Sequence, residues 1–150
     1  MSSSMRIAFW CYFIAALLTG TFGVIYLIKP EFMPYHAEAV GMNWSSVDVG
    51  FQVMILGLMK SHGAACLGMV ISFGALLVGP FREGRIWVKY LLPFVGYIYT
   101  IPVLYVTLNL RAKTGAHTPW IAVVAGMVLV VLGFLFSIYG GGHKVQKIEL

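Results

Sequence analysis

"FQVMILGLMKSHGAACLGMVISFGALLVG", residues 51–79, is the longest apolar run of this chain. Four apolar runs predict membrane spans at about residues 7–28, 46–79, 86–108 and 119–139, and each is near or above the ~20 residues that cross a bilayer core. Charged residues make up 10% of the chain and mean hydropathy is +0.89, whereas soluble domains carry about 25% charged residues. Since a span must satisfy its backbone hydrogen bonds internally, we predict an all-α membrane protein. Residues 1–150 are expected to form a single domain, a four-transmembrane-helix bundle.

The first run follows "MSSSMR" and is too long for a signal peptide, with no Ala-x-Ala site after it, so we expect a retained helix. Basic residues suggest an orientation. One side would hold six of them and the other side three: Arg6, Arg82, Arg85, Lys89, Lys144 and Lys147 against Lys29, Arg111 and Lys113. The positive-inside rule then predicts a bacterial inner-membrane protein with both termini in the cytoplasm. The +5 net charge is expected to attract anionic lipid, and its spread over both sides argues against a nucleic-acid partner.

The first connection, residues 29–50, is long for a helix-to-helix link. Pro30 should end the first helix, and Trp44 suits an interfacial anchor. In "SSVD", Ser45 is the expected N-cap and Asp48 follows three residues later, so the second helix should begin near Ser46. We therefore expect an interfacial extramembrane loop that caps the outer end of the bundle.

Small residues recur along the second helix at helical spacing. The series is Gly57, Ser61, Ala64, Gly68, Ser72, Ala75 and Gly79. Because such spacing lets membrane helices approach closely, we expect this helix to be central in the bundle or to contact a partner subunit or a second copy. In the third helix Pro93 and Pro102 predict a bend, and Thr118 is the expected cap of the fourth. Both cysteines, Cys11 and Cys66, are expected to be buried packing residues.

Lys60 and His62 are polar residues within the longest apolar run. Three environments would accommodate Lys60: the ammonium snorkels to the headgroups, an outer-loop carboxylate such as Glu38 or Asp48 pairs with it, or it faces an anionic or carbonyl-bearing ligand. The first two place the first connection against the second helix. His62 lies on another flank of that helix, where a hydrogen-bonded packing role competes with ligand binding.

Other polar and aromatic candidates cluster near the outer end of the predicted bundle. They are Tyr35, His36, Glu38, Trp44, Arg111, His117 and Trp120. If both outer connections fold over this end, His36 and His117 should meet near Glu38, a combination that can bind metal; Met33 and Met42 would favour copper. The spacing matches no established metal motif, and interfacial anchoring accounts for the tyrosine and the tryptophans. No metal ligand or cofactor is assigned, and a copper-binding protein acting at the outer, periplasmic end is kept as an alternative function.

The segments "FMPYHAEAVGMNW", "LMKSHGAACLG", "PFREGRIWVKY" and "PVLYVTLNLRAKTGAHTPW" together resemble a family of uncharacterised bacterial four-span membrane proteins. More distantly, the layout is similar to the DoxX-like group of small inner-membrane proteins, which share a Lys-x-x-Gly region and a proline-rich basic turn. The first resemblance implies a fold and no activity.

The expected function is a non-catalytic membrane role, as an accessory subunit or a binder of a lipid-like molecule at the outer end. In that role Lys60 would face an anion, Glu38 or Asp48 would be its counter-charge, and His36, Trp44 and Trp120 would frame the mouth. The competing function is an enzyme acting on a lipophilic substrate such as a quinone, with Lys60 or His62 binding a carbonyl oxygen or moving protons.

Overall fold

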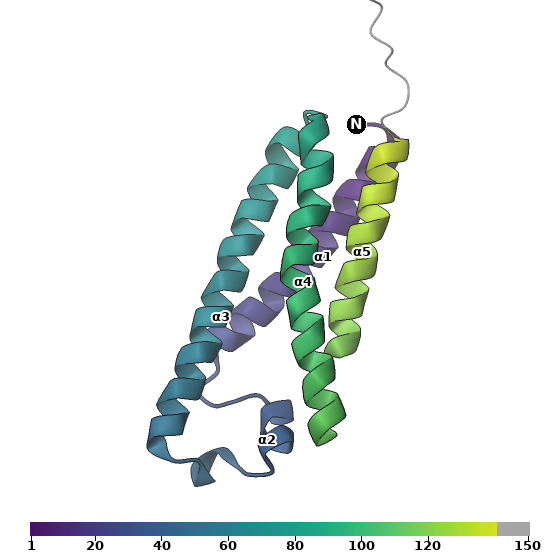
Figure 1. The fold of residues 1–150 in the computed structure, drawn as a ribbon. Helices are drawn as coiled ribbons and strands as arrows, with labels where there is room; N and C mark the ends of the chain where they lie inside the picture. Colours follow the sequence, from purple (N-terminus) through teal and green to yellow (C-terminus); the bar gives the residue numbers. More distant parts are fainter. Residues whose placement is uncertain (141–150) are drawn as a thin grey trace, which may run out of the picture.

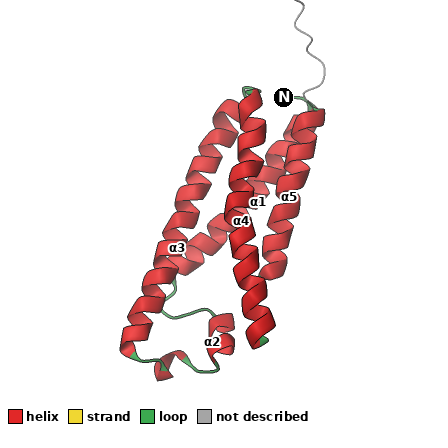
Figure 2. Ribbon diagram, in the orientation of Figure 1, coloured by secondary structure: helices red, strands yellow, loops and turns green. Residues whose placement is uncertain are grey.

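The computed structural model describes residues 1–140, and every regular element among them is helical (Figures 1 and 2). The elements are α1 (Ser3–Ile28), α2 (Pro34–Val40), the 3-10 turn η1 (Trp44–Ser46), α3 (Val49–Leu76), the π-helical turn η2 (Leu77–Phe81), α4 (Ile86–Thr114) and α5 (Trp120–Tyr139). Four stretches are long and apolar enough to cross a membrane: α1, α3 with η2, α4 and α5. The predicted all-α, four-span fold is confirmed. Lys144 and Lys147, used above for orientation, lie outside the described residues.

Two helix starts differ from the sequence prediction. The first helix begins at Ser3, four residues early, because the Ser2 hydroxyl accepts a hydrogen bond from the Met5 backbone N–H. The start of α3 is at Val49, and its cap is Asp48, whose carboxylate accepts from the Gly50 N–H at 2.8 Å. Ser45 is part of η1 and does not cap α3. A carboxylate at this position also interacts favourably with the helix dipole.

Helix α4, which is the third predicted span, is longer than predicted. It continues past residue 108 to Thr114 and ends at Gly115, which adopts a left-handed conformation with φ 76°. Two basic residues in its last turn, Arg111 and Lys113, favour this extension because they oppose the negative end of the helix dipole. The helix runs unbroken through Pro93 and Pro102. Thr118 does not cap α5; Pro119 holds that position, and the Thr118 hydroxyl donates to the Thr107 carbonyl at 3.0 Å.

The central helix is α1, which crosses the bundle diagonally (Figure 1). Its N-terminal half packs on α5 and its C-terminal half on α3, and α4 packs mainly on α5. The expectation that α3 would be central is therefore wrong. The core is densest toward the end of the bundle that carries the N-terminus, where the buried Tyr12 ring stands edge-on to Phe73 and Phe81. Gly133 on α5 leaves the space that this tyrosine ring occupies.

The contact between α1 and α3 is made at glycines outside the predicted small-residue stripe. A Cβ added to Gly63 would lie 2.7 Å from the Gly23 carbonyl oxygen, so the two backbones touch there. The buried side of α3 consists of Met59, Gly63, Cys66 and Phe73. By contrast, a Cβ at Gly57 or Gly68 would meet nothing within 4 Å. The stripe therefore faces outward, and its role as a partner contact stays a prediction.

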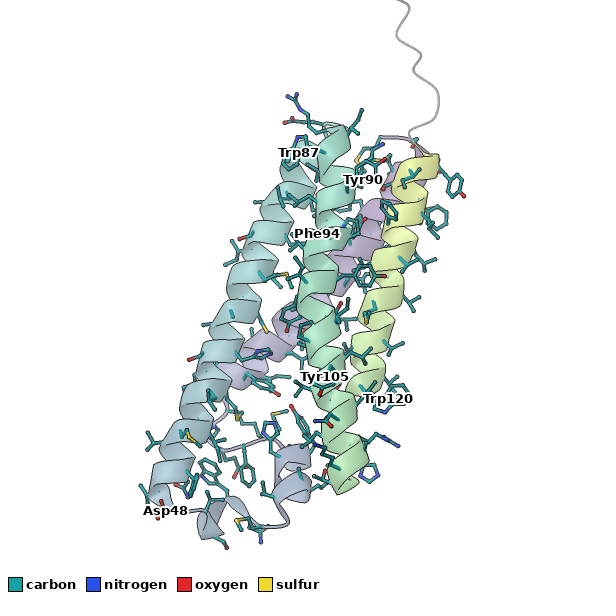
Figure 3. The ribbon with its side chains drawn as sticks, in the orientation of Figure 1. Asp48, Trp87, Tyr90, Phe94, Tyr105 and Trp120 are labelled. Atoms are coloured by element: carbon teal, nitrogen blue, oxygen red, sulfur yellow. The ribbon has the colours of Figure 1, made fainter. Side chains whose placement is uncertain are left out.

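The chain ends and the helix connections mark two ends of the bundle. The N-terminus, the α3–α4 turn and the end of α5 lie together at one end, while α2 lies at the other, called the outer end below (Figure 1). On α4, the exposed Trp87 lies near the first end and the exposed Tyr105 toward the outer end, as does Trp120 on α5 (Figure 3). Aromatic side chains collect at both membrane interfaces. Trp87 and Tyr105 are 18 residues apart, or about 27 Å along a helix, which matches a hydrocarbon core of ~30 Å.

Candidate functional site: a lidded cavity at the outer end

Residues 29–48 fold back over the outer end of the bundle and form what we call the lid. Within it, α2 lies between the outer ends of α3 and α4 (Figure 1). Phe32 is the buried side chain of the lid, at 5% exposure, and its ring meets that of Trp44 edge-on at 4.9 Å. The Gln52 amide of α3 donates to the Trp44 and Val47 carbonyls. These contacts form the cap over the outer end that the sequence predicts.

A carboxylate links the lid to the second outer connection. One oxygen of Glu38 accepts from the His117 backbone N–H at 2.7 Å and lies 3.0 Å from His117 Nδ1. The backbone hydrogen bond, followed by the side-chain one, lowers the pKa of the Glu38 carboxyl. The prediction that the two outer connections meet at Glu38 is thus confirmed for His117.

His36 does not join this pair. Its Nδ1 accepts from the Met33 N–H, and its ring lies against Tyr35 at 4.3 Å and Tyr26 at 6.3 Å. Burial lowers the pKa of His36. The three-residue His36–Glu38–His117 cluster expected from sequence is therefore wrong. Residues 1–140 contain no group of three or more His, Cys, Asp or Glu side chains placed to hold a metal.

We expect lid closure to weaken in two steps as the pH falls. A histidine whose pKa is lowered on folding stabilises the lid above its unfolded pKa, about 6.5, and that stabilisation is lost as the pH falls toward the folded value. The pKa of Glu38 is also lowered on folding. Its stabilisation of the lid is therefore lost as the pH falls below the unfolded pKa of about 4.3. Hydrogen exchange of residues 34–48, corrected for intrinsic rates, should therefore quicken first below about pH 6.5 and again below about pH 4.3. His36→Asn should remove the first step, and Glu38→Gln should remove the second. If both variants kept both steps of the wild type, the assignment of the steps to these residues would be contradicted.

Lys60 has a partner that the sequence did not suggest. Its Nζ donates to the Leu27 carbonyl at 2.9 Å, in the last turn of α1. That carbonyl is one of the last four of α1, which have no hydrogen-bond partner within the helix. A cation there also interacts favourably with the negative end of the helix dipole. The proposed counter-charges are engaged elsewhere, Glu38 by His117 and Asp48 by the start of α3. Lys60 thus caps α1 and does not line the cavity described next.

A partly enclosed space beneath the lid, here the inner cavity, lies between α1, α4 and α5. It holds about 600 Å³ free of protein atoms, its open mouth included. Four polar aromatic side chains from different elements line it: Tyr26 of α1, Tyr35 of α2, His62 of α3 and Tyr99 of α4. A smaller space of about 320 Å³, here the deep extension, shares Ala15, Thr19, Thr100 and Gly126 with it. The extension continues to Phe73 and Val130, away from the lid.

The polar aromatic side chains form a connected cluster. The His62 ring stacks with the Tyr99 ring at 6.2 Å and 20° and lies 5.5 Å from the Tyr26 ring. The Tyr26 and Tyr35 hydroxyls are hydrogen-bonded to each other, and the Tyr99 hydroxyl lies 2.9 Å from the Cys66 sulfur. No group within residues 1–140 hydrogen-bonds to the His62 imidazole. His62 therefore presents free ring nitrogens beside the cavity.

The remaining predicted site residues lie at the rim or outside the cavity. The Arg111 guanidinium stacks over the Trp120 ring at 5.8 Å, a cation–π contact at the start of α5. Trp44 packs on Phe32 within the lid. Of the ten residues predicted to bind a ligand, Tyr35 and His62 line the inner cavity.

Two cavity residues were missed by the sequence analysis, Tyr26 and Tyr99. Both lie within membrane spans, where a phenolic hydroxyl needs a partner. That requirement was the available signal, since a tyrosine away from the interface is costly unless it is paired. Their convergence on His62 depends on how α1 and α4 cross α3, which sequence spacing does not reveal.

These features define a class: a multi-pass helical membrane protein with a lidded, aromatic-lined cavity at one end. Comparison with protein-family models, curated proteins and solved structures finds no match to this chain. The resemblance to the DoxX-like group stays a prediction.

Proposed function

We propose that this protein binds one uncharged lipid-like molecule in the inner cavity. The observation that carries the proposal is the contrast between two adjoining spaces. The inner cavity gathers the imidazole of His62 with three tyrosines, whereas the deep extension is lined mainly by apolar side chains. An amphiphile would place its polar head at the cluster and its tail in the extension, as ligand sites commonly combine few polar groups with apolar walls.

The charge of the lining limits the head group. Lys60, the nearest cation on α3, is engaged by the Leu27 carbonyl, and the residues that line the inner cavity include no Asp, Glu, Lys or Arg. A charged head group would be left without a counter-charge in a desolvated space. A carbonyl or hydroxyl group suits the tyrosine hydroxyls and His62, which can donate or accept a hydrogen bond.

The threonines of the cavity support the same contrast. Thr19, Thr100 and Thr107 each donate to a carbonyl one turn earlier in their own helix. Their donors are therefore satisfied, and they offer a ligand mainly methyl groups. The groups that can hydrogen-bond to a ligand are therefore concentrated in the aromatic cluster beneath the lid.

A second candidate uses the same cavity for chemistry, as an enzyme acting on a lipophilic substrate such as a quinone. The observation that favours it is the free imidazole of His62 between two tyrosine rings. There His62 would hydrogen-bond to a carbonyl oxygen of the ring and exchange a proton with it. Binding is common to both candidates, so the first experiment addresses binding.

We further propose the bacterial inner membrane as its location, with the lid on the periplasmic side. Support comes from the basic residues Arg6, Arg82, Arg85 and Lys89 at the end opposite the lid and from the positive-inside rule. An accessory-subunit role would use the outward-facing stripe on α3, which includes Gly57, Ser61, Ala64, Gly68 and Ser72.

Filling the inner cavity should weaken ligand binding. Gly126 lines both the inner cavity and its deep extension, and a Cβ there would meet no atom within 4 Å. Gly126→Leu should therefore fold normally and lower the affinity for a lipophilic ligand at least about tenfold, because the side chain occupies the ligand's space. The measurement is native mass spectrometry of gently extracted protein, together with quenching of tryptophan fluorescence by decylubiquinone.

The matched control is Gly68→Leu, the same change at a glycine on the outward face of α3 with equally open surroundings. It should retain wild-type binding. Equal binding by both variants, or no saturable binding by the wild type, would refute the proposed function.

A further inference from the structure

A second space adjoins the inner cavity on the other side of the aromatic cluster. This outer groove runs between the lid and the outer part of α3, and about 770 Å³ of it, open mouth included, is free of protein atoms. Phe32, Ala39, Ile55, Leu58 and Met59 give it mostly apolar walls. Apart from His62, the α3 residues that line it precede Lys60, which bonds to the last turn of α1, so the groove lies beside the end of α1.

Two side chains separate the groove from the inner cavity. Tyr26 and His62 line both spaces, and their rings lie 5.5 Å apart. We call this pair the partition. Because both side chains line both spaces, movement of either one would change the passage between them.

The lid holds this partition from both sides. Consecutive residues of α2 lie in different spaces: Tyr35 lines the inner cavity and His36 lines the outer groove. The Tyr35 hydroxyl is hydrogen-bonded to that of Tyr26, and the His36 ring stands edge-on to the Tyr26 ring. The short helix α2 itself contains no buried residue, so it is weakly anchored compared with the spans.

We propose that the outer groove is the first binding compartment for the ligand and that the lid gates its passage into the inner cavity. The ligand class is an uncharged single-tail amphiphile taken up at the bilayer surface, because the groove walls are apolar and lie beside the end of α1. This inference rests on the proposed function, since it describes how the same ligand reaches the same cavity. Movement of α2 releases Tyr26, the partition opens, and the head group passes to His62 and Tyr99.

Exchange kinetics test the route. With decylubiquinone as the probe and tryptophan quenching followed by stopped flow, Tyr35→Phe keeps the ring and removes the hydrogen bond to Tyr26. Association and dissociation should both accelerate by about two- to tenfold, the range expected for one hydrogen bond. The two rates should rise by similar factors, because a gate changes both together, whereas the loss of a hydrogen bond to the ligand would raise dissociation alone.

A blocking variant gives the opposite result. Ala39 lines the outer groove and not the inner cavity, so Ala39→Phe should slow both rates several-fold at a similar affinity. Ala112→Phe, at an exposed position in the outer part of α4, is the control and should leave both rates unchanged.

The two proposals fail in different ways. If binding remains sensitive to Gly126→Leu while Tyr35→Phe and Ala39→Phe leave both rates at the wild-type values, the ligand enters by another route and the gate is refuted. If Gly126→Leu has no effect on binding, the proposed function itself fails.

Discussion

Replacing Gly63 by leucine should lower the free energy of unfolding by about 3 kcal/mol or more, since overpacking against fixed atoms is among the costlier core changes. The first added carbon would lie 2.7 Å from the Gly23 carbonyl oxygen, 3.0 Å from Leu27 Cγ and 3.1 Å from the Leu27 nitrogen. Two of these neighbours are backbone atoms, which cannot rotate away. The helix α1 would have to move off α3, and Lys60 would lose its partner at Leu27.

Unfolding of the purified protein by sodium dodecyl sulfate in mixed micelles measures this effect. Gly68→Leu is the control on the same helix, because a Cβ there meets no atom within 4 Å. It should change stability by less than about 0.5 kcal/mol. Equal losses for both variants would show that α1 and α3 do not cross at Gly63. Dissociation of an oligomer by Gly68→Leu alone would instead support the outward-facing stripe as a partner contact.

The crossing illustrates what the sequence can predict in a membrane bundle. Four spans follow from the apolar runs, because a bilayer demands about 20 such residues each, and the structure has four helices where those runs lie. The apolar runs do not predict which face of α3 packs against α1. Small residues permit close approach without requiring it, and the regular series that includes Gly57 and Gly68 faces outward. The face that packs mixes Gly63 and Cys66 with the larger Met59 and Phe73.

The candidate site shows a similar limit. Lys60 and His62 attract attention because they are polar within an apolar run, and only His62 lines the cavity. Lys60 donates a hydrogen bond to a backbone carbonyl. Every residue has such a carbonyl, so the sequence does not indicate which one is the partner. Tyr26 and Tyr99 come from helices distant in sequence and meet His62 only through the diagonal path of α1. The lid was predictable from its length and its aromatic residues, whereas the partner of each polar side chain within it was not.

Phe32→Ala should open the lid while leaving the bundle folded. Phe32 is the buried side chain of residues 29–48, and its ring packs on Trp44 at 4.9 Å. Truncating a buried phenylalanine costs about 3 kcal/mol or more, equivalent to a rise of about a hundredfold in the open population. The remaining attachments, the Glu38–His117 pair and the Tyr26–Tyr35 hydrogen bond, are polar and each contributes less.

Hydrogen exchange and limited proteolysis of residues 29–48 measure the opening. Met42→Ala removes an exposed side chain from the same segment and should leave its protection unchanged. Global unfolding of Phe32→Ala should stay near the wild-type midpoint, because the lid contributes nothing to the contacts of α1 with α3 and α5. An equal loss of protection in the spans would mean that the lid is an integral part of the core. If protection is lost only in the lid, a ligand bound beneath it should also dissociate faster, since the contacts that position Tyr35 against Tyr26 depend on the same anchor.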